Sequence, residues 1–424
     1  MAGPLPLSLL PDNATVDDAG RLSIAGCDVA GLAEQYGTPL FVYDEDHLRE
    51  RCRDAVAAFG DGVAYATKAF LTTEMARLAF EEGMHLDVAT GGEMHVARNA
   101  GVPVSRLVLH GNNKSRRELE TALDLGVGRI VIDSFDEMER IEDLVGAGFD
   151  RPRVLVRINP GVEAHTHEYL QTGVADSKFG FGIGAEAQAA VSRALGSPAM
   201  QLIGIHAHIG SQVFETSSFR SAVAALAPFV APLDLDEFSI GGGLGVAYIE
   251  GETAPSIAEW ANTIREACAD HGIGGRILAE PGRAIVARAA VTLYTVGTIK
   301  EIPGVRTYVA VDGGMSDNPR PGLYGSGYEA FLPRRTTAPR ARQVRIVGKH
   351  CESGDVIVED AAVPTALAVG DVLATPVTGA YGHSMGSNYN MIRRPPVVFV
   401  RNGEARLVVR RETYEDLTRR DVSP

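Results

Sequence analysis

The pattern that decides the fold is clearest at residues 129–147, which read RIVIDSFDEMERIEDLVGA. The first part, Arg129–Ser134, is a short run rich in β-branched side chains, which predicts a buried strand. The second part, Phe135–Ala147, places its apolar residues at helical spacing, which predicts an amphipathic helix. A strand followed by a helix is the repeating unit of α/β proteins, so its recurrence along the chain determines the architecture.

The same alternation extends from residue 62 to residue 283. Eight such units favour a closed (β/α)8 TIM barrel, and the alternative is an open doubly wound sheet in which two strands are misassigned. Ser115 and Glu118 form a capping box at the start of one helix. The predicted strands are Gly62–Ala69, His85–Thr90, Arg106–Gly111, Arg129–Ser134, Arg153–Pro160, Leu202–Gly210, Phe238–Gly243 and Arg276–Arg283, and helices include Ser115–Leu125, Phe135–Ala147, Ser217–Phe229 and Ile257–His271.

After residue 283 the sequence changes to β-rich segments with few helices. These segments predict a C-terminal β domain of sandwich or barrel-like form. Arg21–Ile24 and Leu40–Val42 are short strand candidates in the N-terminal segment, which we expect to pair with the β domain. The predicted division is therefore a barrel at 43–283 and a β domain at 1–42 and 284–424. The β segments are Ala290–Thr298, Thr307–Asp312, Gln343–Val347, Val372–Thr378, Val397–Arg401 and Ala405–Arg410.

Composition narrows the functional class. The 424 residues carry 40 basic and 54 acidic side chains, a net charge of −14, and 45% are apolar. Such a charge disfavours binding to nucleic acid or to an anionic membrane surface. The four cysteines form no CxxC pair, and we find no apolar run long enough for a membrane span. Without a signal-peptide pattern at the N-terminus, we expect a cytoplasmic enzyme.

Polar residues follow most of the predicted barrel strands. In a TIM barrel the carboxyl ends of the strands meet at one face, which carries the active site. Polar groups at so many strand ends exceed what a purely structural barrel needs, so we expect an active site there. The residues are Lys68, Asp87, His110, Asp133, Arg157, Asn159, His206, His208, Glu280 and Arg283.

Two of these residues have specific chemical interpretations. Lys68 is either a strand-end lysine that reaches solvent or a partly desolvated amine suited to Schiff-base chemistry. Glu280 ends a buried strand and therefore needs a partner. That partner is either Arg283, in an internal ion pair, or the protonated ring nitrogen of a pyridine cofactor.

The glycine triplet Gly241–Gly243 follows the seventh predicted strand. Val246 breaks the GxGxxG pattern, so no dinucleotide fingerprint is present. Glycine-rich backbone at the last strands of a barrel is instead suited to a phosphate, with Arg283 as the cation.

Histidines at the strand ends allow two interpretations. His206 and His208 lie on one face of a strand and could form a metal site with His110 and Asp87. We expect no metal, because no HExxH motif or further ligand cluster supports one. An imidazole stacked on a flat cofactor is the preferred interpretation, and we interpret His165–Glu168 as loop.

The β domain contains three polar clusters, at 312–324, 350–355 and 379–390. Cys351 lies among polar residues, which is unusual for a core cysteine. It is either structural or a thiol placed to donate a proton.

Together these motifs carry a family resemblance. The chain resembles the fold type III pyridoxal-phosphate (PLP) decarboxylases of the alanine racemase-like barrel family, and within them the bacterial diaminopimelate decarboxylase branch. The resemblance runs from about residue 37 to the C-terminus. It rests on the segments Tyr65–Ala69, Leu86–Glu93, His110–Lys114, Ser177–Gly180, His206–Gln212, Gly241–Gly243, Glu280–Arg283, Asp312–Met315, Arg320–Tyr324, Cys351–Asp355 and Tyr389–Asn390.

The resemblance implies roles for individual residues. Lys68 would bind PLP as a Schiff base, His208 would stack on its ring and Glu280 would pair with the ring nitrogen, with Asp87 nearby. Cys351 would donate a proton. The phosphate contacts would come from Ser211, Gly243, Gly282, Arg283 and Tyr389. Pro281 would also bind the cofactor, and the substrate contacts would come from Arg283, Arg320, Tyr324, Glu352 and Tyr389.

The resemblance also implies the reaction and the assembly. The expected reaction is decarboxylation of meso-2,6-diaminopimelate at its D centre to L-lysine and CO2, the last step of lysine biosynthesis. The expected assembly is a homodimer in which Cys351 and Glu352 come from the partner subunit. Phe70 departs from the family pattern, in which many relatives have asparagine at this position. Residues 161–183 are a candidate lid.

Two alternatives remain open. One is a related PLP decarboxylase for ornithine, arginine, carboxynorspermidine or a carrier-bound glutamate. The other is a non-catalytic homologue, which the presence of both Lys68 and Cys351 disfavours.

Overall fold

The computed structural model describes residues 3–161 and 177–422. The chain divides into two compact units. The β unit comprises Met1–Glu50, Ala247–Thr253 and Ile285–Pro424, and the barrel unit comprises Arg51–Val246 and Ala254–Ala284. The sequence-based division has its boundaries at 42/43 and 283/284, and it has no counterpart of the short segment 247–253.

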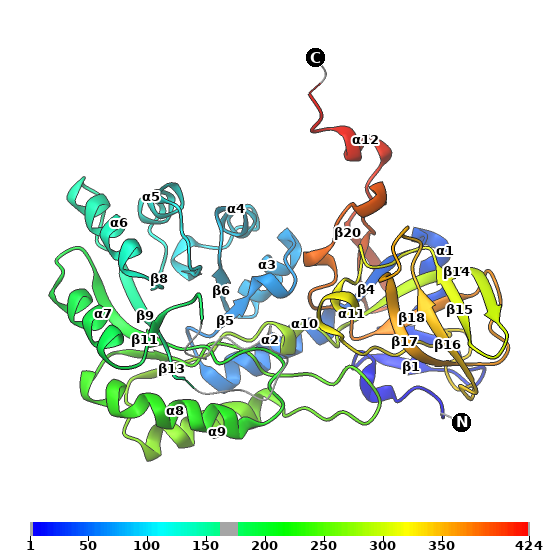
Figure 1. The fold of residues 1–424 in the computed structure, drawn as a ribbon, viewed down its shortest axis with the longest axis horizontal. Helices are drawn as coiled ribbons and strands as arrows, with labels where there is room; N and C mark the ends of the chain where they lie inside the picture. Colours follow the sequence, from blue (N-terminus) through cyan, green and yellow to red (C-terminus); the bar gives the residue numbers. More distant parts are fainter. Residues whose placement is uncertain (1–2, 162–176, 423–424) are drawn as a thin grey trace. The chain divides into compact units, whose positions relative to one another are not determined.

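The sheet of the barrel unit (Figure 1) has nine strands in the described residues, and eight of them form one continuous parallel path. The ends of this sheet meet, because Ala64 N donates to Ala279 O at 3.0 Å and Ala66 N donates to Pro281 O at 3.1 Å. The TIM-barrel prediction is confirmed. The strands, in order around the sheet, are β5 (Ala64–Ala66), β6 (His85–Val88), β7 (Leu107–Leu109), β8 (Arg129–Ile132), β9 (Arg153–Asn159), β11 (Gln201–His206), β12 (Glu237–Ser239) and β13 (Arg276–Leu278), and β10 (Phe181–Gly182) pairs with β9.

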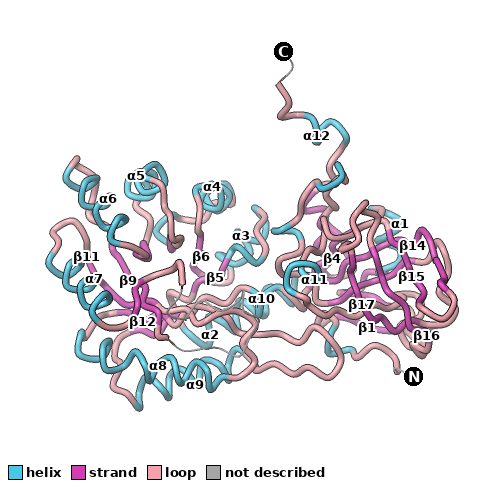
Figure 2. Tube along the Cα trace, viewed as in Figure 1, coloured by secondary structure: helices cyan, strands magenta, loops and turns pink. Residues whose placement is uncertain are grey.

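Helices of the barrel unit lie outside its strands (Figure 2). The predicted capping box is present, since Ser115 Oγ accepts from Glu118 N and the Glu118 carboxylate accepts from Ser115 N. The helices are α3 (Thr73–Glu81), α4 (Gly91–Asn99), α5 (Arg116–Leu125), α6 (Phe135–Gly146), α7 (Ala185–Gly196), α8 (Thr216–Val230) and α9 (Ile257–Asp270), while α2 (Glu45–Phe59) and α10 (Arg283–Val286) run across unit boundaries and η2 (Thr67–Ala69), η3 (Val104–Arg106) and η5 (Ala231–Leu233) are 3-10 turns.

Small and branched apolar side chains from five of the barrel strands meet in the interior of the barrel. Ala64, Val108, Val131, Leu155 and Ile203 form one buried cluster. Side chains of this size fill a closed eight-stranded barrel, so this cluster is part of a packed core. Chemistry is therefore confined to the ends of the strands.

A charged layer occupies the amino-terminal ends of the barrel strands. The fully buried Glu237 accepts from Arg129 Nε and Nη2 at 2.7 Å each and from Arg276 Nη2 at 2.8 Å. His85 Nε2 lies 2.9 Å from Arg106 Nη1, and its Nδ1 lies 3.3 Å from Arg129 Nη1. Burial and these two arginines lower the pKa of His85 to about 4. His85 is therefore neutral at physiological pH.

The β unit is built on one eight-stranded sheet that includes a strand from the N-terminal segment. β4 (Leu40–Asp44) pairs antiparallel with β14 (Ala290–Ile302) and parallel with β19 (Val397–Arg401). The expected pairing with the C-terminal β domain is thus confirmed for Leu40–Val42. It is wrong for Arg21–Ile24, which lies in a separate small sheet of the N-terminal segment. The sheet is completed by β15 (Arg306–Val311), β16 (Arg342–Val347), β17 (Val356–Val363), β18 (Val372–Pro376) and β20 (Glu404–Val409).

Shorter elements complete the β unit. β1 (Ala14–Val16), β2 (Leu22–Ile24) and β3 (Cys27–Asp28) form a small separate sheet. The remaining elements are α1 (Val29–Tyr36), α11 (Arg320–Tyr324), α12 (Tyr414–Thr418) and the 3-10 turns η1 (Leu7–Leu9), η6 (His383–Met385) and η7 (Tyr389–Met391).

Two sequence expectations differ from the structure. Strand β17 was not predicted, because Glu359 and Asp360 interrupt its apolar residues and remove the alternation that marks a strand. The first barrel strand ends at Ala66, and Lys68 lies in the following 3-10 turn η2. In the part of the chain that the structure describes, no helix combines the length and apolar character needed to cross a lipid bilayer.

Candidate active site

A buried carboxylate–imidazole cluster lies at the carboxyl ends of the barrel strands. Glu280, just after β13, has Oε2 at 3.0 Å from Nε2 of His206, the last residue of β11. Its Oε1 lies 3.3 Å from Nε2 of His110, which follows β7, and accepts from Ser239 Oγ at 3.2 Å. The two imidazoles make an edge-to-face pair with centroids 5.0 Å apart. Residues from three strands thus converge on one carboxylate, which itself follows a fourth.

Electrostatics within this cluster favour an ionised Glu280. Burial alone would raise the pKa of Glu280, but His206 and His110 outweigh it and hold that pKa well below its usual range. Burial would likewise lower the pKa of His110, yet Asp87 and Glu280 raise it. Burial raises the pKa of Asp87. A negative charge is therefore retained on Glu280 inside the barrel, where a cationic ring nitrogen could pair with it.

The side chain of Lys68 is exposed in η2. Its exposure matches a strand-end lysine that reaches solvent and not a partly desolvated amine. The adjacent Thr67 Oγ1 donates to Asp87 O at 2.7 Å and ties this turn to β6. His208 follows β11, and burial together with the cations Lys68 and Arg157 holds the pKa of His208 well below its usual range. The imidazole of His208 is therefore neutral, which suits stacking against a flat ring.

Backbone from three strand ends meets at the glycine triplet. A Cβ at Gly242 would lie 2.3 Å from Glu280 O, and one at Gly243 would lie 2.3 Å from Gly210 O. Gly243 also has a φ of +111°, so a side chain is excluded on both counts. Arg283 Nη2 donates to Ser211 Oγ at 2.9 Å beside this turn. The backbone of the glycine triplet, Ser211 and Arg283 can donate hydrogen bonds to a phosphate. The carboxylate of Glu280 can pair with a pyridine nitrogen. The residues present therefore fit PLP.

The candidate lid lies partly outside the described residues, which omit 162–176. Its described end is held to the strand ends by several contacts. Asp133 Oδ1 accepts from Gly180 N at 2.7 Å, and Asn159 Nδ2 donates to Phe179 O. The guanidinium of Arg157 lies 4.5 Å from the centroid of the Phe179 ring. Three of the polar strand-end residues are thus used to anchor this segment.

Arg320 occupies an aromatic site in the β unit. Its side chain is 2% exposed, its Nε donates to Tyr328 Oη at 3.0 Å, and its Nη2 donates to Ser326 Oγ at 2.9 Å. The guanidinium carbon lies 4.9 Å from the ring centroid of Tyr248 and 5.7 Å from that of Tyr324. Burial opposes the charge, but the tyrosines raise the pKa of Arg320. A buried cation held by neutral groups is suited to binding an anion.

The sequence predicted Arg320 and Tyr324 but missed the other members of this site. Tyr248 comes from the short segment 247–253, Tyr328 from the chain after α11, and Tyr381, whose ring centroid lies 5.9 Å from the Arg320 guanidinium carbon, from the third polar cluster. Tyrosines so far apart in sequence carry no local signal that they share one site.

A second cluster in the β unit contains Cys351, Glu352 and Tyr389. Cys351 is exposed, whereas the other three cysteines are buried, which excludes the core interpretation of this thiol. Cys351 N donates to Asn390 Oδ1 at 3.0 Å, and Tyr389 Oη lies 3.5 Å from Glu352 Oε2. His350 stacks on Tyr389 with ring centroids 5.2 Å apart. The structure therefore groups the predicted Cys351, Glu352 and Tyr389 together.

The imidazole–carboxylate cluster also has the spacing of a metal site. One ligand atom each from His110, His206 and Glu280 lies within 4.8 Å of the others. Both imidazoles already engage the carboxylate, so a metal ion is not required to offset its buried charge. The expectation that the protein binds no metal stays a prediction.

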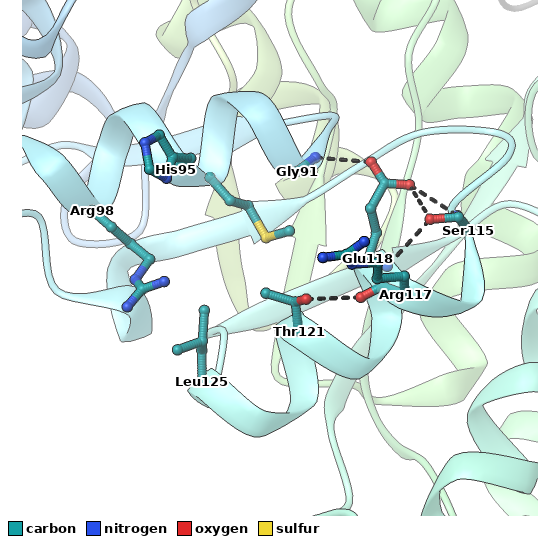
Figure 3. Close-up of a pocket in the computed structure, with 9 residues that line it drawn as sticks. Gly91, His95, Arg98, Ser115, Arg117, Glu118, Thr121 and Leu125 are labelled. Carbon is teal, nitrogen blue, oxygen red and sulfur yellow. Dashed lines mark hydrogen bonds between the residues drawn. The ribbon is translucent and has the colours of Figure 1, made fainter.

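Two surface cavities lie away from these residues. The cavity in Figure 3, of about 310 Å³, lies between α4 and α5. Glu118 points across it and accepts from Gly91 N at 2.8 Å, while Arg98 and Arg117 are exposed. Another, of about 520 Å³, is lined by residues of α6 and α7 such as Glu142 and Arg193. Neither includes a predicted site residue.

Comparison with known proteins identifies the family. Residues 45–287 match the family model described as pyridoxal-dependent decarboxylase, pyridoxal binding domain. The chain is 47% identical to the diaminopimelate decarboxylase of Bacillus subtilis, with 95% of each chain covered, and 46% identical to that of Halalkalibacterium halodurans, with 96% of each covered. A crystal structure of diaminopimelate decarboxylase from M. jannaschii in complex with L-lysine matches with a TM-score of 0.90 and 32% identity, covering 98% of each chain. The chain therefore belongs to the pyridoxal-dependent decarboxylase family and, within it, to the diaminopimelate decarboxylases.

Proposed function

We propose that this protein is a PLP-dependent carboxy-lyase that converts meso-2,6-diaminopimelate into L-lysine and CO2 by decarboxylation at the D centre. Membership of the diaminopimelate decarboxylases supports this reaction. The observation that carries it in this chain is the buried guanidinium of Arg320. The hydrogen bonds found for it among the described residues go to the neutral hydroxyls of Tyr328 and Ser326, so a substrate carboxylate is its natural counter-ion.

Residues of the barrel unit hold the cofactor in this proposal. Lys68 forms the covalent attachment, and the neutral ring of His208 stacks on the pyridine face. Glu280 pairs with the ring nitrogen, and Asp87 lies on the neighbouring strand end. When bound, PLP supplies an electron sink for the carbanion that remains after CO2 leaves. The phosphate is bound by Ser211, Gly243, Gly282, Arg283 and Tyr389, and Pro281 contacts the cofactor beside them.

The ionised state of Glu280 is the main electrostatic contribution of the barrel. Its carboxylate stabilises a proton on the pyridine nitrogen, which strengthens electron withdrawal by the ring. His206 and His110 keep Glu280 charged and fix its two oxygens. Because His208 is neutral, it adds no positive charge to the face on which it stacks.

Residues of the β unit recognise the distal end of the substrate and handle the proton. Arg320 and Tyr324, with Arg283 and Tyr389, bind the carboxylate at the L centre. Glu352 accepts from the substrate ammonium, and Cys351 gives the proton that replaces CO2. We further propose a homodimer in the cytoplasm in which Cys351 and Glu352 serve the partner's site, with no role in binding nucleic acid.

The alternative substrates differ at the distal end. Ornithine and arginine have no distal carboxylate. With either bound, the charge of Arg320 would stay buried without a counter-ion, which is energetically unfavourable. Carboxynorspermidine and a carrier-bound glutamate present different distal groups. Diaminopimelate satisfies both Arg320 and Glu352, which is why we prefer it.

The test is a decarboxylation assay of the purified protein with added PLP on meso-diaminopimelate, ornithine, arginine and lysine. We expect CO2 release and lysine formation from diaminopimelate alone. CO2 release from another amino acid, with none from diaminopimelate, would overturn the substrate while retaining the cofactor. No turnover of any substrate by PLP-loaded protein would instead support a non-catalytic homologue.

A further inference from the structure

His350 lies at the centre of the polar cluster that contains Cys351, Glu352 and Tyr389, yet the proposed function assigns it no role. Its side chain is 8% exposed. Nε2 lies 2.9 Å from Ser316 Oγ and accepts from Ser316 N at 3.3 Å. Nδ1 lies 3.3 Å from Asn390 Oδ1. One imidazole therefore touches both the 312–317 loop and the 389–391 turn.

These contacts select one tautomer of His350. A backbone N–H can only donate, so the contact from Ser316 N requires Nε2 to accept. The proton of the neutral ring is then on Nδ1, which donates to Asn390 Oδ1. The same oxygen accepts from Cys351 N at 3.0 Å. A single amide oxygen thus links the imidazole to the backbone of Cys351.

The ring face of His350 makes a second connection. It is stacked on Tyr389 with an interplanar angle of 18° and a centroid distance of 5.2 Å. Tyr389 Oη in turn lies 3.5 Å from Glu352 Oε2. Asn390 has a φ of +51°, a conformation that asparagine adopts more readily than most residues. The turn that carries Tyr389 and Asn390 is thus shaped to face the imidazole.

Asp355 anchors the backbone of His350 from the other side. Its carboxylate accepts from His350 N at 2.8 Å and from Met315 N at 2.6 Å. A Cβ at Gly348 would lie 2.2 Å from the Asp355 carboxylate, so the chain is closely packed around it. This packing fixes the position of His350, which can then act as a rigid support.

We propose that His350 is a positioning residue that orients the Cys351 backbone through Asn390 and the Tyr389 ring by stacking. It does not touch the reacting atoms in this proposal. The inference rests on the proposed function, in which Cys351 is the proton donor and Tyr389 binds the cofactor phosphate. Its distinctive consequence is that His350 acts through Cys351, and that the Asn390 amide is the link.

The first test is amide hydrogen exchange in the PLP-loaded enzyme. His350→Ala and Asn390→Ala should each speed exchange at the Cys351 amide by about tenfold, because its hydrogen bond is weakened or lost. Exchange at the Ala64 amide in the barrel should not change. His350→Asn, which keeps a donor near the Nδ1 position, should restore slow exchange, whereas His350→Phe, which keeps only the stacking ring, should not.

The second test is a double-mutant cycle on turnover. We expect His350→Phe, which keeps the ring that stacks on Tyr389, to lower kcat about tenfold in the wild-type background and less than twofold in a Cys351→Ala background, with KM changed less than kcat. His271→Ala, on the surface after α9, is the control for loss of a histidine and should leave kcat unchanged.

If His350 only stabilised the fold, its substitution would give other results in these two tests. Equal losses of kcat in both backgrounds, or unchanged Cys351 amide exchange in His350→Ala, would overturn the proposal. The exchange result requires no turnover. Failure of wild-type protein to decarboxylate diaminopimelate would therefore overturn the substrate assignment, while the exchange result decides the role of His350 separately.

Discussion

His206 Nε2 lies 3.0 Å from Glu280 Oε2, with both side chains buried at the carboxyl ends of barrel strands. The contact joins β11 to the segment that follows β13 and aims one carboxylate oxygen at an imidazole. His110 engages the other oxygen at 3.3 Å. Because the two imidazoles hold the pKa of Glu280 well below its usual range, this carboxylate keeps its charge in a buried site.

The first prediction concerns that charge. Glu280→Gln keeps the shape of the side chain but cannot stabilise a proton on the pyridine nitrogen, so kcat should fall roughly 100-fold or more. Steady-state turnover at saturating PLP measures this. Glu266→Gln, which removes an exposed carboxylate from α9, is the matched control and should retain full activity. An unchanged kcat in Glu280→Gln would refute the assigned pairing.

The second prediction concerns the attachment of the cofactor. Lys68→Ala should abolish the visible absorbance of PLP-loaded protein, because the variant lacks the amine that forms the Schiff base with the aldehyde of PLP. The measurement is the absorbance spectrum of protein that has been incubated with PLP and then separated from unbound PLP by gel filtration. Lys300→Ala, on an exposed part of β14, should retain the absorbance. A Lys68→Ala protein with the wild-type spectrum would show that another residue holds the cofactor.

The third prediction concerns the distal carboxylate. Arg320→Lys loses the planar guanidinium that Tyr328 and Ser326 hold by hydrogen bonds. A charge-assisted hydrogen bond contributes about 1.5–3 kcal/mol, so KM for diaminopimelate should rise roughly 10- to 100-fold. The PLP absorbance should be unchanged. Loss of absorbance together with activity would mean that Arg320 supports the cofactor and not the substrate.

The fourth prediction concerns shared sites. A Lys68→Ala chain and a Cys351→Ala chain are each expected to be nearly inactive as homodimers. In a mixed dimer one site combines the intact Lys68 of one chain with the intact Cys351 of the other, so part of the activity should return. Turnover of the purified mixed dimer measures this. Two different affinity tags would demonstrate that the mixed dimer has formed. If that dimer recovers no activity, the shared-site arrangement is contradicted.

The fifth prediction concerns pH and stability at the opposite end of the barrel. The pKa of His85 is about 4 in the folded chain against an ordinary value of 6.5, because burial and Arg129 and Arg106 oppose its charge. The unfolded chain therefore binds this proton first as pH falls. Stability contributed by neutral His85 is complete above pH 6.5 and declines from there to about pH 4, by on the order of 3 kcal/mol.

Urea unfolding at several pH values measures this decline. His85→Asn removes the titrating group, so its midpoint should fall less than that of the wild type between pH 6.5 and 4. His95→Asn, on the exposed face of α4, should follow the wild-type curve. Parallel curves for wild type and His85→Asn would exclude His85 as the source.

Much of the barrel follows from local sequence. The eight strands and the helices between them were predictable because periods of two and of about 3.6 residues are set by nearest neighbours in the chain. Polar strand ends such as Glu280 and His206 were recognisable for the same reason, since a barrel brings all carboxyl ends to one face. The pattern does not predict strand β17, because Glu359 and Asp360 interrupt its apolar residues.

Partner choice, in contrast, depends on contacts between residues far apart in sequence. Sequence alone determined the barrel and the β-rich remainder, and it proposed most residues of the candidate site. It left open whether Glu280 pairs with Arg283, and only the tertiary structure revealed its contacts with His206 and His110. The tyrosines around Arg320 and the link from His350 through Asn390 to Cys351 likewise emerge only on folding. Local periodicity specifies which face a side chain occupies, whereas its neighbour on that face is decided by packing between distant segments.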